Sequence, residues 1–194
     1  MRRIVPLAAL AAMALAAPAW GAEGVTLSAQ PSVVAYDGLV RLTGATVPLS
    51  EVFLVQRLRS GWTVIAQTRA GTDGVFLFER RARKPGVFQA RMVGVESEQV
   101  ATRIRPRLRA RLDGSIVTGR VLPARAGSVV LRVQGRTRRL RVGSAGRFRA
   151  RLGMLRAGKH AVRVSIRPAP GYVGVLRSFA LRIHRPTLRI GSNR

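Results

Sequence analysis

Arginine and apolar residues alternate at a strict period of two in several short segments of this chain. Leu108, Ala110 and Leu112 alternate with arginines, and residues 147–152 repeat the arrangement around Phe148 and Ala150. A period of two is that of a β-strand, in which successive side chains point to opposite faces. These segments therefore predict strands with an apolar face in a core and an arginine face in solvent.

Short runs rich in Val, Leu, Ile, Thr and Phe fill the chain from residue 25 onward, and Gly, Pro, Ser and Asp separate them. No segment has a sustained helical period. The strands predicted in the first half are 25–29, 39–44, 52–58, 62–68, 75–80, 87–93 and 100–105. Those predicted in the second half are 107–112, 116–122, 129–134, 138–142, 148–152, 161–167 and 178–184. Two sets of seven short strands predict an all-β protein with two tandem seven-stranded immunoglobulin-like β-sandwiches.

The two halves also match at a constant offset. The phrase Gly74-Val75-Phe76 corresponds to Gly146-Arg147-Phe148, and Gly86 corresponds to Gly158 at the same offset of 72 residues. The phrase at 42–44 likewise echoes that at 117–119. A gap-free match indicates an internal duplication. We expect the sandwiches to span residues 23–105 and 106–187, with a tail at 188–194 and almost no linker at Pro106.

The first 22 residues have the pattern of a signal peptide. Arg2 and Arg3 precede an apolar run at 4–17, and residues 17–19 fit the small-x-small cleavage pattern. The alternative is an uncleaved membrane anchor. The run is shorter than the roughly 20 residues that a spanning helix needs, and two prolines interrupt it. We therefore expect a secreted, extracellular protein, associated with the cell wall, with no membrane span after cleavage.

Positive charge is concentrated in the second half of the chain. The net charge is +27; residues 23–103 carry ten basic and seven acidic side chains, whereas residues 104–194 carry 23 basic and one acidic. In the usual immunoglobulin-like order, the first, second and fifth strands of the second half are neighbours in one sheet. Seven arginines would then share an outer face: Arg107, Arg109, Arg111, Arg120, Arg147, Arg149 and Arg151.

Such a face would attract polyanions, because guanidinium pairs bidentately with phosphate and carboxylate. The alternative is that arginine reflects composition alone and has no partner. Nucleic acid is disfavoured as a partner, because the basic strands carry few aromatic side chains for base stacking. We expect a cell-wall polymer or another envelope polyanion as the partner.

The sequence offers no catalytic constellation. The chain has no cysteine, which excludes a disulfide framework and thiol chemistry. Asp113 is the one carboxylate of the second half, and Asp37 and Asp73 precede glycine, as is typical of turns. His160 and His184 have no spacing that suits a metal site. We expect no enzyme activity, no cofactor, no metal and no small-molecule substrate.

Five phrases carry a family resemblance: residues 27–32, 40–44, 61–66, 72–76 and 88–91. They resemble a bacterial immunoglobulin-like repeat of exported actinobacterial proteins. The resemblance covers residues 25–105 well and the second half more loosely, because the Gly-Trp-Thr phrase is missing there. It implies a fold rather than an activity. Residues 188–192 are similar to the opening of a peptidoglycan-binding helical repeat, which precedes an L,D-transpeptidase domain in similar exported proteins.

The leading hypothesis is therefore an exported, non-catalytic spacer and interaction module of a cell-envelope, peptidoglycan-associated protein. The alternative is a polyanion-binding protein that holds anionic wall glycopolymer on the arginine face of its second half. Two origins stay open: the front portion of a longer wall-remodelling protein, or a truncated relative of one.

Overall fold

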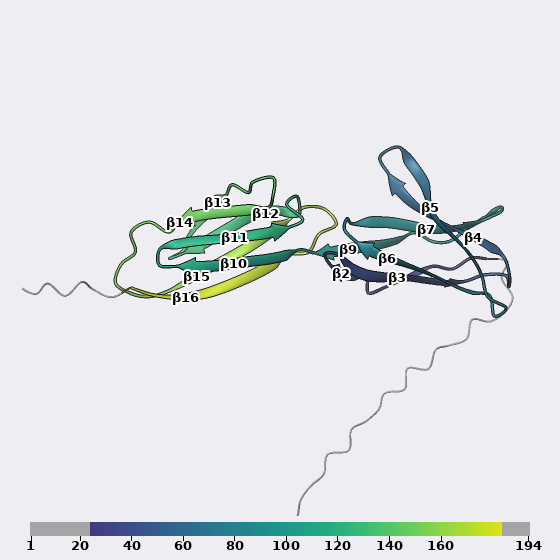
Figure 1. The fold of residues 1–194 in the computed structure, drawn as a ribbon, viewed down its shortest axis with the longest axis horizontal. Coiled ribbons are helices and arrows are strands. Elements are labelled where there is room, and N and C mark those ends of the chain that lie inside the picture. Colours follow the sequence, from purple (N-terminus) through teal and green to yellow (C-terminus); the bar gives the residue numbers. More distant parts are fainter. Residues whose placement is uncertain (1–23, 184–194) are drawn as a thin grey trace, which may run out of the picture.

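Every regular element in residues 24–183, the part of the chain that the computed structural model describes, is a β-strand. The strands form four sheets, two from each half of the chain, and each pair of sheets encloses a core (Figure 1). The two sandwiches lie end to end. The predicted fold class, two tandem immunoglobulin-like β-sandwiches, is confirmed. No helix in the described residues is long and apolar enough to cross a membrane.

The first sandwich packs a three-stranded sheet against a six-stranded one. The smaller sheet has the order β1 (Ser28–Gln30), β3 (Gly38–Ala45) and β6 (Val75–Ala82). The larger sheet has the order β2 (Val33–Ala35), β9 (Val100–Arg105), β7 (Gly86–Met92), β4 (Glu51–Leu58) and β5 (Gly61–Arg69), and β8 (Val95–Glu96) pairs with β7. All pairings are antiparallel except that of β2 with β9.

The strand count of the first sandwich is a correction to the sequence prediction. All seven predicted strands are present, but β2 and β8 are additional. These two strands have three and two residues. Segments of that length are too short to display a period of two, so the alternation pattern cannot reveal them.

The second sandwich has the seven strands that were predicted. One sheet has the order β10 (Arg107–Asp113), β11 (Ile116–Leu122) and β14 (Arg147–Arg151). The other has the order β13 (Arg136–Leu140), β12 (Gly127–Val133), β15 (Gly158–Pro168) and β16 (Val175–Ile183). The first, second and fifth strands are therefore neighbours, as the prediction of a shared arginine face requires. The predicted end of the last strand, His184, lies outside the described residues.

Alternation also identifies the core of the second sandwich correctly. Val162, Val164 and Ile166 on β15 are 0–3% exposed, and Leu108 and Phe148 pack in the same cluster from the opposite sheet. The arginines between these positions are exposed. Burial of the apolar side chains is the main favourable term that holds the two sheets together in the absence of disulfides.

The structure pairs the residues that carry the internal repeat. Gly44 lies opposite Phe76 in the first sandwich, and Gly119 lies opposite Phe148 in the second. The turn before each phenylalanine is also the same: the N–H of Gly74 donates to the Gly71 carbonyl at 3.0 Å, as Gly146 does to its counterpart at 2.9 Å. The sequence match thus corresponds to one packing arrangement that occurs twice.

The sandwiches meet without a linker. Pro106, which is buried, is the single residue between β9 and β10. The N–H of Ile104 donates to the Gly171 carbonyl at 3.0 Å, and the N–H of Val173 donates to the Ile104 carbonyl at 2.9 Å. Tyr172, between them, packs against the core of the second sandwich and against a buried cluster of the first.

The sequence places the boundary near Pro106, and the domain bounds 23–105 and 106–187 stay predictions. The proposed signal peptide, residues 1–22, and the tail at 188–194 lie outside the described residues.

Candidate polyanion interface

The structure brings the seven predicted arginines onto one surface of the second sandwich. Arg109, Arg120 and Arg147 lie directly opposite one another on β10, β11 and β14. Residues opposed in this way on antiparallel strands project from the same side of a sheet. Four more flank this row at alternate positions of β10 and β14: Arg107, Arg111, Arg149 and Arg151. All seven are exposed, and together they form what we call the arginine face.

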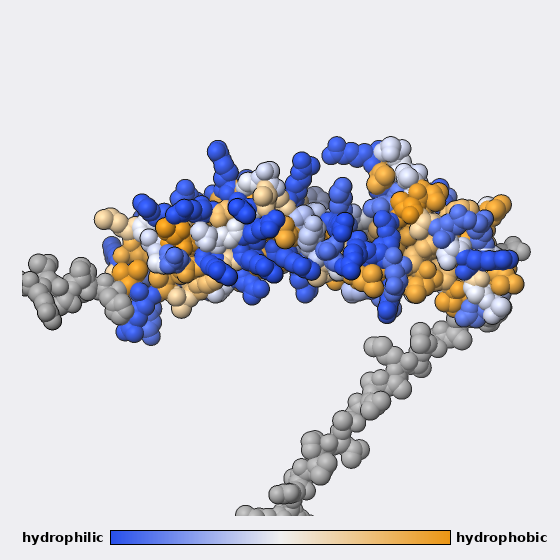
Figure 2. All heavy atoms as spheres, viewed as in Figure 1, coloured by the Kyte–Doolittle hydropathy of each residue, from blue (hydrophilic) through white to orange (hydrophobic). Residues whose placement is uncertain are grey.

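The row of three arginines juxtaposes like charges across strands. Directly opposed like charges destabilise a sheet, whereas opposite charges stabilise it by about 0.2–1 kcal/mol per pair. No carboxylate lies directly opposite an arginine of the row. Asp113, the one carboxylate of the three strands, is on the same outer side at the end of β10, where it lies opposite Ile116. The arrangement therefore leaves an unbalanced charge that an anion would neutralise. In the view of Figure 2, hydrophilic side chains project along most of the second sandwich, at the left.

The first sandwich balances its charges instead. Three cross-strand positions there bring together residues of opposite charge: Arg41 and Glu79, Glu51 and Arg69, and Arg91 and Glu96. The first and third of these close as ion pairs, with N–O distances of 2.8 and 3.0 Å. All ion pairs found among the described residues belong to the first sandwich. A general bias toward arginine would not by itself separate the two sandwiches in this way.

The remaining ion pair joins Asp37 and Arg83. Asp37, in the β2–β3 turn, accepts a hydrogen bond from Nε of Arg83 at 2.9 Å. This hydrogen bond lowers the pKa of the Asp37 carboxyl, and the charges of Arg83, Arg81 and Arg107 act in the same direction. Arg107 belongs to the arginine face, so its field reaches the end of the first sandwich.

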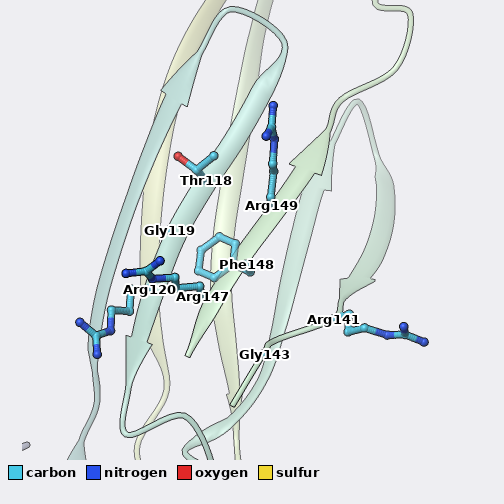
Figure 3. A pocket seen from close by; sticks show the side chains of 8 residues that line it. All are labelled: Thr118, Gly119, Arg120, Arg141, Gly143, Arg147, Phe148 and Arg149. Carbon is cyan, nitrogen blue, oxygen red and sulfur yellow. The ribbon is translucent and has the colours of Figure 1, made fainter. Parts of the chain in front are cut away.

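A hollow opens beside the arginine face, where β14 follows the β13–β14 loop (Figure 3). Its lining consists of Thr118, Gly119, Arg120, Arg141, Gly143, Arg147, Phe148 and Arg149. Nε of Arg120 donates to the Ala145 carbonyl at 3.1 Å, and the N–H of Gly143 donates to the Arg147 carbonyl at 2.9 Å. These bonds fix the loop against the sheet. In Figure 3, Arg141 projects away from the other arginines.

Arg141 was not among the predicted site residues. The sequence places it in a predicted strand at 138–142, but β13 ends at Leu140 and Arg141 lies in the loop that follows. Only the fold places it near Arg120 and Arg147. Phe148 lines the hollow but is 4% exposed, as expected for a core residue. The outer positions of the three strands carry no aromatic side chain, so this face offers no platform for stacking bases.

The described residues contain no group of three or more His, Cys, Asp and Glu side chains that could hold a metal ion. His160 on β15 contacts the β12–β13 turn and the β14–β15 loop. Its Nε2 lies 2.6 Å from the Arg156 carbonyl oxygen, and its Nδ1 lies 3.2 Å from the Gln134 amide nitrogen.

No known family model matches the sequence, and no curated protein matches it. Several solved structures are similar in fold. A tetra-tandem repeat from the extending region of a large adhesion protein has a TM-score of 0.43 and 15% identity, over 83% of this chain and 49% of that one. The chain thus spans about half the length of that structure.

Fibronectin(III)-like modules of Clostridium thermocellum CbhA have a TM-score of 0.33 and 12% identity, over 88% of this chain and 99% of that one. The CD2-binding domain of CD58 has a TM-score of 0.34 and 13% identity, over 79% and 96%. These likenesses identify neither a family nor a function for the chain.

Proposed function

We propose that this chain is an exported, non-catalytic module that binds an anionic wall glycopolymer through the arginine face of its second sandwich. The observation that carries the proposal is the row of directly opposed Arg109, Arg120 and Arg147, in which no carboxylate is a cross-strand partner. Export rests on the predicted signal peptide, and the envelope context rests on the resemblance to exported wall proteins.

The geometry suits a linear polymer with repeated phosphate or carboxylate groups. Neighbouring strands are about 4.8 Å apart, and same-face residues along a strand are about 6.7 Å apart, so the face presents a grid of cations. Each guanidinium can bind one anionic group bidentately. Binding would release counterions from the polymer and would therefore weaken as salt concentration rises.

The test is a pulldown of the purified chain on isolated bacterial sacculi across a salt series. Three face arginines are replaced together, as Arg109→Gln, Arg147→Gln and Arg149→Gln. We expect the wild-type chain to bind at low salt and to dissociate as salt rises. The slope of log affinity against log salt should become shallower by about one unit per arginine removed.

The matched control replaces three exposed arginines of the first sandwich: Arg57, Arg59 and Arg103. It changes the net charge equally and should bind like the wild type. Sacculi stripped of their glycopolymer should bind neither protein. Equal weakening of both variants, binding that high salt does not weaken, or no binding at any salt would each refute the proposal.

We also propose that the chain acts as a spacer, as the leading interpretation of the sequence holds. The supporting observation is the joint, where Pro106 alone separates the two sandwiches and Tyr172 packs against both. Two bodies joined in this way would hold whatever they bind at a fixed separation, unlike domains on a flexible linker.

A further inference from the structure

The second sandwich has another cationic surface, on the sheet opposite the arginine face. Arg132 on β12 lies directly opposite Arg163 on β15, and Lys159 on β15 lies directly opposite Arg182 on β16. These are again like charges opposed across strands, an unfavourable arrangement in the absence of an anion. All four are exposed.

Strand alternation places these side chains on the outside of their sheet. Arg163 stands between Val162 and Val164, both fully buried, and its partner Arg132 follows the buried Leu131. Two more exposed arginines take outer positions on the same sheet, Arg139 opposite Val130 and Arg167 opposite Ser128. We call this second surface the opposite face, made of Arg132, Arg139, Lys159, Arg163, Arg167 and Arg182. Its four strands contain no carboxylate.

The two cationic faces are separated by the core of the sandwich. Leu108 and Phe148 from one sheet pack against Val129, Val162 and Val164 from the other, between the faces. Packed sheets lie about 10 Å apart, and the arginines extend outward from both. A short stretch of polymer on one face therefore cannot contact the other.

We propose that the second sandwich is bivalent and cross-links two polyanion strands, one on each face. The partner belongs to the class argued above, a linear polymer with repeated phosphate or carboxylate groups, so this inference rests on the proposed function for its chemistry. It adds a second binding surface to the arginine face, and it predicts that binding joins separate polymer strands. A single cationic face would coat a polymer, whereas two opposed faces join neighbouring strands.

The edge of the sandwich suggests a competing arrangement. Arg136 and Arg138 on β13, the edge strand of the opposite face, are both exposed. A long polymer could follow them from one face to the other and wrap a single molecule. Wrapping and cross-linking predict different outcomes for a long polymer, because a wrapped molecule joins no second polymer strand.

The experiment uses the full chain with linear polyphosphate as the probe, in a short and a long form. Titration calorimetry with the short form measures the number of ligands per chain, and light scattering with the long form measures cross-linking. Three variants of equal net charge are compared. One carries Arg109→Gln, Arg147→Gln and Arg149→Gln; one carries Arg132→Gln, Arg163→Gln and Arg167→Gln; and the control carries Arg57→Gln, Arg59→Gln and Arg103→Gln.

We expect two short ligands per wild-type and control chain, and one per chain for either face variant. The long polymer should cause scattering with the wild type and the control, and markedly less with each face variant. Because all three variants have the same net charge, precipitation by charge neutralisation alone would affect them equally, and that result would overturn the proposal.

Two short ligands per wild-type chain, with no scattering from the long polymer, would indicate wrapping and would also overturn it, as would a single short ligand per wild-type chain. The outcome separates this inference from the function proposed above. If only the arginine-face variant loses binding, cross-linking fails while the proposed function stands. If the wild type binds no polyphosphate, both fail.

Discussion

Gly119 shapes the surface beside the arginine face by having no side chain. The ring of Phe148 lies over it from the neighbouring strand, and a Cβ at this position would overlap both the ring and the Arg109 carbonyl oxygen. Gly44 and Phe76 repeat the arrangement in the first sandwich. The glycine thus allows a large aromatic side chain to close the core while the sheet stays continuous.

We predict that Gly119→Ala destabilises the second sandwich by about 1–3 kcal/mol, the usual cost of overpacking a well-packed core. Backbone atoms surround the new methyl group on one side, so the strain cannot be relieved by rotating a side chain. Urea denaturation of the variant and the wild type measures the difference.

Gly143→Ala is the matched control, because this glycine lines the same hollow but has only the Arg147 carbonyl oxygen near, 3.7 Å from the added Cβ. It should leave the free energy of unfolding almost unchanged. Equal stability of Gly119→Ala and wild type would mean that Phe148 does not pack as described.

At the scale of elements, the three strands β10, β11 and β14 make a sheet with seven arginines and one carboxylate, Asp113, on its outer side. Arg120 on the central strand has an arginine on each side, at Arg109 and Arg147. Repulsion within this row opposes folding and is screened by salt, since the Debye length falls as ionic strength rises.

We predict that Arg109→Gln with Arg147→Gln stabilises the chain at low salt, by about 0.2–1 kcal/mol for each relieved pair. Arg120 is kept, because its Nε holds the β13–β14 loop through the Ala145 carbonyl. Thermal unfolding at low and high salt measures the gain, which should shrink as salt rises.

The corresponding control is Arg57→Gln with Arg59→Gln, at exposed positions in the first sandwich; it should have little effect. A loss of stability in the Arg109 and Arg147 variant at low salt would show that the row is not repulsive.

The sequence predicts these strands better than it predicts the surface they form. Alternation around Leu108, Phe148 and Val162 is strict because one face is buried and the other solvated, and β10, β14 and β15 follow from it. Cross-strand register depends on how strands align in three dimensions, so the opposition of Arg109, Arg120 and Arg147 became visible only in the fold. Arg141 escaped prediction because the sequence places it in a strand at 138–142, whereas the strand ends at Leu140 and the residue lies in the following loop.

For the molecule as a whole, the joint determines whether the sandwiches act as one body. Tyr172 is the side chain that packs against both cores, and its burial raises the pKa of its phenol, with a smaller contribution from Tyr36. Gly171 lies against Pro85 of the first sandwich. Ile104 forms backbone hydrogen bonds with Gly171 and Val173 of the same loop.

We predict that Tyr172→Ala lets the sandwiches move independently. Removing a half-buried aromatic side chain should weaken their contact by about 1–2 kcal/mol, part of the value for burying a full apolar side chain. NMR relaxation measures one rotational correlation time for the wild type and two shorter ones for the variant.

Tyr172→Phe keeps the ring and should behave like the wild type. If the alanine variant retained a single correlation time, the Pro106 connection and the loop hydrogen bonds would be sufficient to hold the joint.

The parallel pairing of β2 with β9 makes the first sandwich resist tension that acts along these two strands. The chain runs along β2 toward the joint and leaves the first sandwich through β9, in the same direction. Tension applied at the two ends of this sandwich would slide the two strands past each other lengthwise. The backbone hydrogen bonds from Tyr36 to Arg105 and from Arg103 to Ser32 would then bear the force together, because the force acts across both of them at once rather than opening one at a time.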